Sequence, residues 1–166
     1  MLYSVIGYYS LILGLFTATI LIYFSIKNFQ NSELLDTKIL SFSFLQFFLV
    51  VISFLCLILS FILSDFSNET VFNNSHTTKP LFYKISGTWG NHEGSLLLWL
   101  LVLTLFILLF LIKTKNQTIK YKILTLVFQQ IIIIGFFIFL IKTSNPFNYL
   151  FPVPEEGLGL NPILQD

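Results

Sequence analysis

The sequence has 166 residues, of which 55% are hydrophobic and only 10% are charged, and its mean hydropathy is +0.85. Soluble domains carry about 25% charged residues, so this composition excludes an ordinary soluble domain. All nine basic residues are Lys and the net charge is +1, which argues against a nucleic-acid partner because phosphate and base recognition favour the Arg guanidinium. The single cysteine, Cys56, excludes an internal disulfide and a C-x-x-C-H haem attachment site within this chain.

Four apolar runs are long enough to cross a membrane, which takes about 20 residues for roughly 30 Å of hydrocarbon. Because backbone exposed to lipid must satisfy its own hydrogen bonds, we expect each run to be helical. The sequence therefore predicts an all-α integral membrane protein, one membrane domain over residues 1–166 with lipid as its neighbour. The predicted spans are Leu2–Ile26, Ile39–Leu63, Ser95–Ile112 and Ile123–Ile141.

The lysines between the spans predict an orientation. The two short loops, residues 27–38 and 113–122, carry six lysines, whereas the outer loop 64–94 and the outer tail 142–166 carry three. The positive-inside rule places the lysine-rich side in the cytoplasm or matrix. Both termini are then expected on the periplasmic or intermembrane-space side.

The N-terminal run is predicted to be a membrane span, not a cleaved leader. It has no basic first segment, no A-x-A site and no Arg-rich amphipathic stretch. The chain is rich in Phe, Ile, Lys and Asn and has a single Ala, a usage typical of AT-rich genomes such as those of organelles. We therefore expect the mitochondrial inner membrane, with the bacterial inner membrane as the alternative.

The end of the outer loop has the pattern of a helix start at the membrane surface. Thr88 or Asn91 is suited to cap the helix, and Glu93 suits the positive end of its dipole. One interpretation is an aromatic anchor with a cap, since Trp is enriched at membrane interfaces. The other is a binding rim or partner interface. The candidate residues for it are Trp89, Gly90, His92, Glu93, Gly94 and Trp99.

The two histidines do not have the spacing of a metal site, so no metal ligand is predicted. His76 lies in a polar stretch of the outer loop and is expected to be solvated, and we expect no regular secondary structure in that loop. In the tail, Asn145-Pro146 is predicted to end the fourth helix. The adjacent carboxylates Glu155 and Glu156 are expected to be solvated as well.

Several strings resemble the CcmF family, the membrane haem lyase subunit of cytochrome c maturation. Trp89-Gly-Asn-His-Glu-Gly-Ser-Leu-Leu-Leu-Trp99 resembles its W-G-x-H-E-G-S-L-L-L-W string. Thr143-Ser-Asn-Pro-Phe147 and Glu156–Asp166 are similar to its T-S-N-P-F and E-G-x-x-L-N-P-L-L-Q-D strings, in the same order. The resemblance covers the whole chain but only about the N-terminal quarter of the family protein.

This resemblance implies one piece of a split haem lyase, a subunit without its own catalytic centre that helps attach haem covalently to apocytochrome c. The family's tryptophan-rich WWD motif and its four haem-serving histidines lie downstream of the matching region, and His92 matches none of those four. The implied partners are one or more companion chains carrying the WWD motif and these histidines, other cytochrome c maturation proteins, and apocytochrome c. Haem b is implied for the assembled complex, with ligands on a companion chain and none held by this chain alone.

Three alternatives remain open from the sequence. They are a structural subunit of a respiratory or transport complex, a related haem lyase serving nitrite reductase cytochromes, and an ion or solute channel. The absence of charged residues between 39 and 63 and between 95 and 112 argues against a channel.

Overall fold

The computed structural model describes residues 1–27, 33–114 and 116–159, and these are helical apart from their connections and one isolated β-bridge. Each of the four long helices is long and apolar enough to span a membrane, as the sequence predicts. Two short helices lie between the second and third of them. The helices are α1 (Leu2–Lys27), α2 (Glu33–Ile62), α3 (Glu69–Asn74), α4 (Leu81–Gly87), α5 (His92–Lys113) and α6 (Ile119–Lys142).

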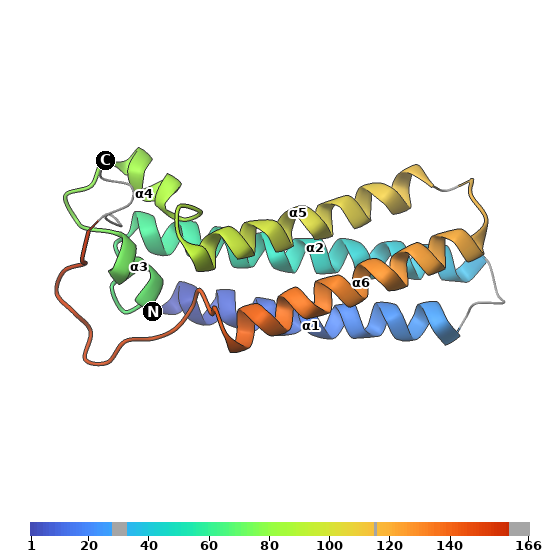
Figure 1. Ribbon diagram of the computed structural model, residues 1–166, viewed down its shortest axis with the longest axis horizontal. Coiled ribbons are helices and arrows are strands. Elements are labelled where there is room, and N and C mark those ends of the chain that lie inside the picture. The colour runs from blue at the N-terminus through green and yellow to red at the C-terminus, as the bar shows by residue number, and fades with distance from the viewer. Residues whose placement is uncertain (28–32, 115, 160–166) are drawn as a thin grey trace.

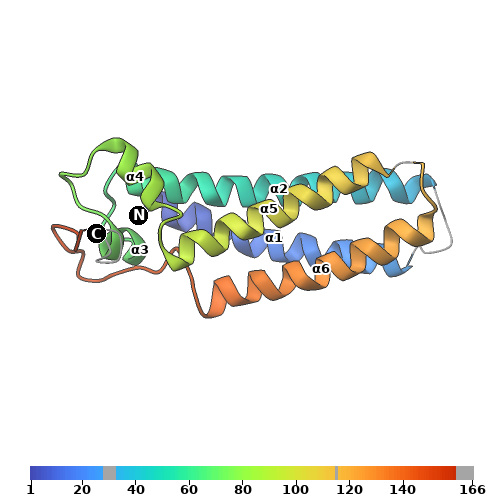
Figure 2. The same ribbon diagram turned by 45° about the horizontal axis from the view of Figure 1, so that its top comes forward.

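The four long helices form an antiparallel four-sided bundle (Figures 1 and 2). α1 packs against α2 and α6, and α5 packs against the same two helices, so α2 and α6 face each other across a diagonal. The N-terminus, α3 and α4 lie at one end, here called the terminal end (Figure 1). The helix ends that carry the other predicted inner lysines lie at the opposite end, and Lys115 falls outside the described residues. Which end faces which side of the membrane stays a prediction.

The helices extend beyond the predicted spans, mainly at their beginnings. α5 begins at His92 where the prediction began at Ser95, and α6 begins at Ile119 where the prediction began at Ile123. Hydropathy marks only the residues that suit hydrocarbon, whereas a helix continues into polar residues wherever its end groups find partners. The N-terminal extensions of α5 and α6 are therefore polar turns at the two ends of the bundle.

The expectation that the outer loop lacks regular structure was wrong, because α3 and α4 lie within it. Asn68 caps α3, with its Oδ1 accepting from the backbone N of Val71 at 3.2 Å. Pro80 precedes α4 with a φ of −58°, the angle that a helix start requires. Both signals are local and short, and a helix of six or seven residues leaves no hydrophobic period to detect.

Two glycines on α1 receive aromatic rings. A Cβ at Gly7 would lie 2.4 Å from Cζ of Phe147, and one at Gly14 would lie 2.7 Å from Cζ of Phe137. Both rings are buried, at 5% and 0% exposure. These two glycines thus allow a close contact with a side chain of the same chain. At Gly135 of α6, a Cβ would meet no atom of a neighbouring helix within 4 Å among the described residues.

A pair of glutamines joins the diagonal helices in the middle of the bundle. Gln46 of α2 and Gln130 of α6 exchange two amide hydrogen bonds, each 3.0 Å long. Their exposures are 1% and 0%. Each amide satisfies the other in a region without water, so the pair fixes the register of α2 against α6.

Candidate functional site

The candidate motif forms the junction between the outer loop and α5. Asn91 is the N-cap, and its Oδ1 accepts from the backbone N of Gly94 at 2.7 Å. Its Nδ2 donates to the carbonyl oxygens of Gly87 at 2.7 Å and Thr88 at 3.2 Å. Asn91 is only 7% exposed. Of the two candidate cap residues, Thr88 and Asn91, Asn91 is therefore the N-cap of α5. It also holds the end of α4 against the start of α5.

Gly94 is required by this turn. A Cβ at this position would lie 1.6 Å from the carbonyl oxygen of Thr88 and 3.1 Å from Oδ1 of Asn91. The first contact is with backbone, which cannot move aside without opening the turn. Gly94 thus has a structural role within the motif and does not form part of an open rim.

Glu93 lies beside a polar cavity of about 200 Å³ at the terminal end. The cavity brings together the first turn of α5, the short helix α3 and the segment that follows α6. A second acidic residue, Glu69, lines the same cavity. The other lining residues are Thr70, Asn73, Thr143, Ser144, Asn145 and Asn148. Of the predicted site residues, Glu93 alone lines this cavity.

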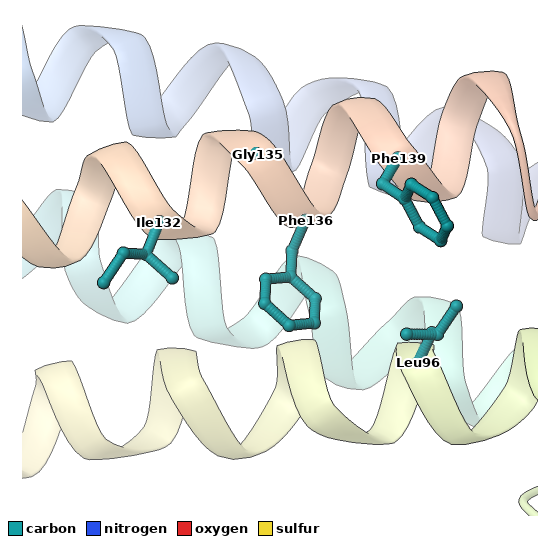
Figure 3. Close-up of a pocket in the computed structure, with 5 residues that line it drawn as sticks. All are labelled: Leu96, Ile132, Gly135, Phe136 and Phe139. Atoms are coloured by element: carbon teal, nitrogen blue, oxygen red, sulfur yellow. The ribbon is translucent and has the colours of Figure 1, made fainter.

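His92 turns instead toward α6, where its ring meets that of Phe139 edge-on, with centroids 6.4 Å apart. Phe139 also lines a groove of about 430 Å³ between α5 and α6, together with Leu96 of α5 and Ile132, Gly135 and Phe136 of α6 (Figure 3). Figure 3 shows Ile132 and Phe136 directed toward α5. We name this feature the α5–α6 groove.

The two tryptophans lie at the surface of the chain. Trp89 is 42% exposed and Trp99 is 60% exposed, and Gly90 is exposed as well. Trp99 follows His92 by seven residues and therefore lies on the same side of α5. The structure thus divides the predicted site: Glu93 faces the polar cavity, His92 and Trp99 lie on another side of α5, and Gly94 supports the turn.

Several hydrogen bonds join the segment after α6 to the outer loop. The backbone N of Glu69 donates to the carbonyl of Asn148 at 2.9 Å, and that of Leu150 donates to the carbonyl of Ser67 at 2.9 Å. Further on, the carboxylate of Glu156 accepts from the backbone N and the hydroxyl of Thr77 at 3.0 and 2.6 Å. We call this contact the tail clamp. Residues 160–166, which complete the predicted outer tail, lie outside the described part.

The tail clamp gives two exposed residues contacts that the sequence did not indicate. The hydrogen bond from the Thr77 side chain, helped by the backbone N–H groups of Thr77 and Gly157 and by nearby His76, lowers the pKa of Glu156 below its usual range. His76 Nε2 lies 3.8 Å from Oε1 of Glu156, and its Nδ1 lies 2.9 Å from the hydroxyl of Thr78. His76 and Glu156 therefore take part in a contact between loop and tail, while both side chains stay partly exposed, as the sequence suggested.

Asn68 is a residue whose role the sequence did not indicate. Besides capping α3, its Nδ2 donates to Oγ of Ser4 at 3.1 Å and to the carbonyl oxygen of Pro146 at 2.9 Å. Its side chain is completely buried. Asn68 therefore ties α1, α3 and the segment after α6 together beside the polar cavity. An Asn followed by Glu-Thr gives a cap signal, but nothing in the sequence indicates its two distant partners.

The described residues do not fit a haem ligand set. His76 is engaged in the tail clamp and His92 packs against Phe139, so the two imidazoles serve different contacts. Within residues 1–27, 33–114 and 116–159, no group of three or more His, Cys, Asp or Glu side chains is placed to hold a metal ion. We therefore derive no haem chemistry from the side chains of this chain.

A family model and two relatives that are similar to this chain are named for the assembly or biogenesis of c-type cytochromes. The family model described as cytochrome C assembly protein matches residues 89–166. The cytochrome c-type biogenesis protein CycK of Rhizobium meliloti is 42% identical over 97% of this chain, and the protein CcmF of Escherichia coli is 38% identical over 75% of it. The chain corresponds to an N-terminal-like part of a CcmF-type protein.

The structure has the same fold as part of a solved CcmF chain. A structure named cytochrome c heme lyase CcmF superposes with a TM-score of 0.80 at 24% identity and covers 88% of this chain. The chain spans about a quarter of the relatives it matches, 24% of CycK and 25% of that solved CcmF chain. CycK of Rhizobium meliloti and CcmF of Escherichia coli are both bacterial proteins.

Proposed function

We propose that this chain is the four-helix membrane part of a haem lyase assembly that attaches haem to apocytochrome c. The observation that carries the proposal is the 42% identity to a cytochrome c-type biogenesis protein along 97% of this chain. Identity of that extent includes the spans as well as the W-G-N-H-E-G string, so it exceeds what apolar composition alone would produce. A structural subunit of a respiratory complex has no comparable support.

The assembly also needs the rest of a CcmF-type protein. We propose that a companion polypeptide, carried on one or more separate chains, supplies the WWD motif and the histidines that bind haem b. This division rests on the resemblance to the CcmF family, whose WWD motif and haem-serving histidines lie downstream of the matching region. The membrane is then the mitochondrial inner membrane if the chain is organelle-encoded, and the bacterial inner membrane otherwise, with apocytochrome c and other maturation proteins as partners.

Within the assembly, the terminal end is the part of this chain suited to meet a partner or apocytochrome c. The polar cavity presents the carboxylates of Glu69 and Glu93, and Trp89 and Trp99 are exposed beside α5. The Asn91 cap, the Asn68 contacts and the tail clamp fix this end to the bundle. We propose that His92, Glu93 and Trp89 form the rim of the assembled site, while Gly94 holds the turn beneath it.

The function is tested by replacement in a bacterium. A chimera, in which this chain replaces the matching segment of a bacterial CcmF, is expressed in a strain that lacks CcmF. Covalent haem on c-type cytochromes is then measured by haem staining of denaturing gels. Restored staining is the expected result. Full-length accumulation of the chimera in the membrane without any staining would count against a role in haem attachment.

The rim is tested separately with Glu93→Gln and His92→Ala in the same chimera. We expect staining to fall at least severalfold while the chimera still accumulates, because these side chains take no part in the hydrogen bonds of the turn. A matched control is Tyr121→Phe, an exposed position at the opposite end of the bundle, which should leave staining unchanged. Full staining in both rim variants would exclude the rim and leave the four-helix scaffold as the role of this chain.

A further inference from the structure

The α5–α6 groove is an open apolar feature of the bundle at membrane depth. Its lining belongs to helices that are less covered than their neighbours. Within the apolar windows of the spans, 33% of α5 and 33% of α6 is buried, compared with 39% of α1 and 44% of α2. The groove holds about 430 Å³ between Leu96 on α5 and Ile132, Phe136 and Phe139 on α6.

Gly135 makes this groove different from ordinary lipid-facing surface. It lies inside the 24-residue helix α6, where glycine costs backbone entropy without giving a side chain to pack. A Cβ at this position would meet no atom of a neighbouring helix within 4 Å in the described part of the chain. The bundle itself therefore gives no reason for a glycine here. Small residues at the surface of membrane helices allow another helix to approach closely.

Gln129 adds a polar signal on the same side of α6. It precedes Ile132 by three residues and Phe136 by seven, so the three side chains follow one stripe toward α5. Its Oε1 is buried and has no hydrogen-bond partner among the residues that the structure describes. An unpaired amide oxygen in hydrocarbon is costly, whereas the other mid-span amides, those of Gln46 and Gln130, satisfy each other. A donor on a neighbouring helix would satisfy this oxygen once the Gln129 side chain turns toward the groove.

We propose that the α5–α6 groove is the docking site for a transmembrane helix from the part of a CcmF-type protein that this chain does not contain. The chain spans about a quarter of its relatives, so the remaining part must contact the four-helix bundle if both act together. The docking helix approaches α6 at Gly135 and carries a side-chain hydrogen-bond donor at the level of Gln129. This inference rests on the proposed function, since it takes the two parts to form one assembly.

The second apolar groove of the bundle lacks these signals. It lies between α2 and α5 and holds about 370 Å³. It contains no glycine, and its polar lining residue, Ser41, already donates to the carbonyl of Thr37 at 2.9 Å. Lipid acyl chains are sufficient to cover such a surface. The α5–α6 groove is therefore the one to which we assign the partner helix.

The test measures association directly. This chain, carrying an affinity tag, is expressed together with the remaining part of a bacterial CcmF, and the recovered amount of that part is measured after extraction in mild detergent. Gly135→Trp places an indole ring in the α5–α6 groove. Leu13→Trp places the same ring on α1, at a residue that is 52% exposed. We expect Gly135→Trp to lower recovery about tenfold or more, Leu13→Trp to leave it unchanged, and Gln129→Leu to lower it about threefold.

Equal recovery with Gly135→Trp and Leu13→Trp would overturn the proposal and leave lipid as the occupant of the groove. A photo-crosslinking residue at position 135 gives a second measurement that does not depend on a bulky substitution. Crosslinks to a transmembrane segment of the remaining part support the proposal, and adducts with lipid alone contradict it. Haem staining in the same cells separates the two claims: recovered association without haem attachment counts against the function and leaves the docking site standing.

Discussion

The α1 side and the α5–α6 side of the bundle use glycine in opposite ways. On α1, Gly7 and Gly14 receive the rings of Phe147 and Phe137, both from this same chain. On α6, Gly135 receives nothing. Packing of the first kind completes the bundle, since an aromatic ring against a helix backbone buries a large apolar area without a cavity. The chain thus closes its core on one side and leaves the open α5–α6 groove on the other.

The largest effect is expected where the closed side is broken. Gly14→Leu places a side chain where Phe137 lies, and overpacking of this kind costs about 1–3 kcal/mol. Gly135→Leu, its matched partner, should leave stability unchanged or raise it slightly, because glycine is a poor helix former and the site is open. Thermal unfolding of the two variants in detergent, followed by circular dichroism, gives the comparison. Equal losses in both would show that the two glycines do not differ as the structure indicates.

The next effect concerns the centre of the bundle. Gln46→Leu leaves the amide of Gln130 buried without its partner, which should destabilise the bundle by about 1–2 kcal/mol. The double variant Gln46→Leu with Gln130→Leu should recover most of that loss, because two apolar side chains replace the pair. Additive losses in a double-mutant cycle would contradict a specific bond between the two amides.

A smaller, local effect is expected at the terminal end. Asn68→Ala removes the cap of α3 and the bonds to Ser4 and Pro146, which should cost about 1 kcal/mol. The loss should appear as faster amide exchange in residues 66–74 and 146–150, with the mid-span residues of the bundle unaffected. Asn116→Ala, at the opposite end, is the matched control. Faster exchange throughout the bundle would mean that Asn68 supports the whole fold.

The smallest effect is a pH dependence of the tail clamp. The pKa of Glu156 is lowered in the folded chain, so its contribution is present above the ordinary pKa of a carboxyl group and declines as pH falls through the lowered value. We expect protection of the amide of Thr77 to weaken on acidification, and Glu156→Gln to remove this pH dependence. An unchanged profile in the variant would assign the titration to another group.

Long apolar runs made the four spans predictable, because a segment that crosses the hydrocarbon core must be apolar and helical. The end of α6 at Lys142, before Asn145-Pro146, followed equally well from local rules. The cap at Asn91 was one of two candidates, since both Thr88 and Asn91 have suitable side chains and only the structure shows which side-chain oxygen reaches Gly94.

The division of the candidate site was not predictable. His92 and Glu93 are adjacent in the sequence, yet successive helical side chains point about 100° apart, so one faces Phe139 and the other the polar cavity. The Gln46–Gln130 pair and the contacts of Asn68 join residues far apart in the chain. Periodicity locates helices but does not say which polar side chains will meet across the bundle.

The decisive experiment for a role in a haem lyase assembly is purification of this chain from its own membrane in mild detergent, with identification of bound proteins and an absorbance spectrum. We expect recovery of the remaining part of a CcmF-type protein, bearing the WWD motif, together with the spectrum of haem b. Recovery of respiratory-complex subunits without haem would contradict that role.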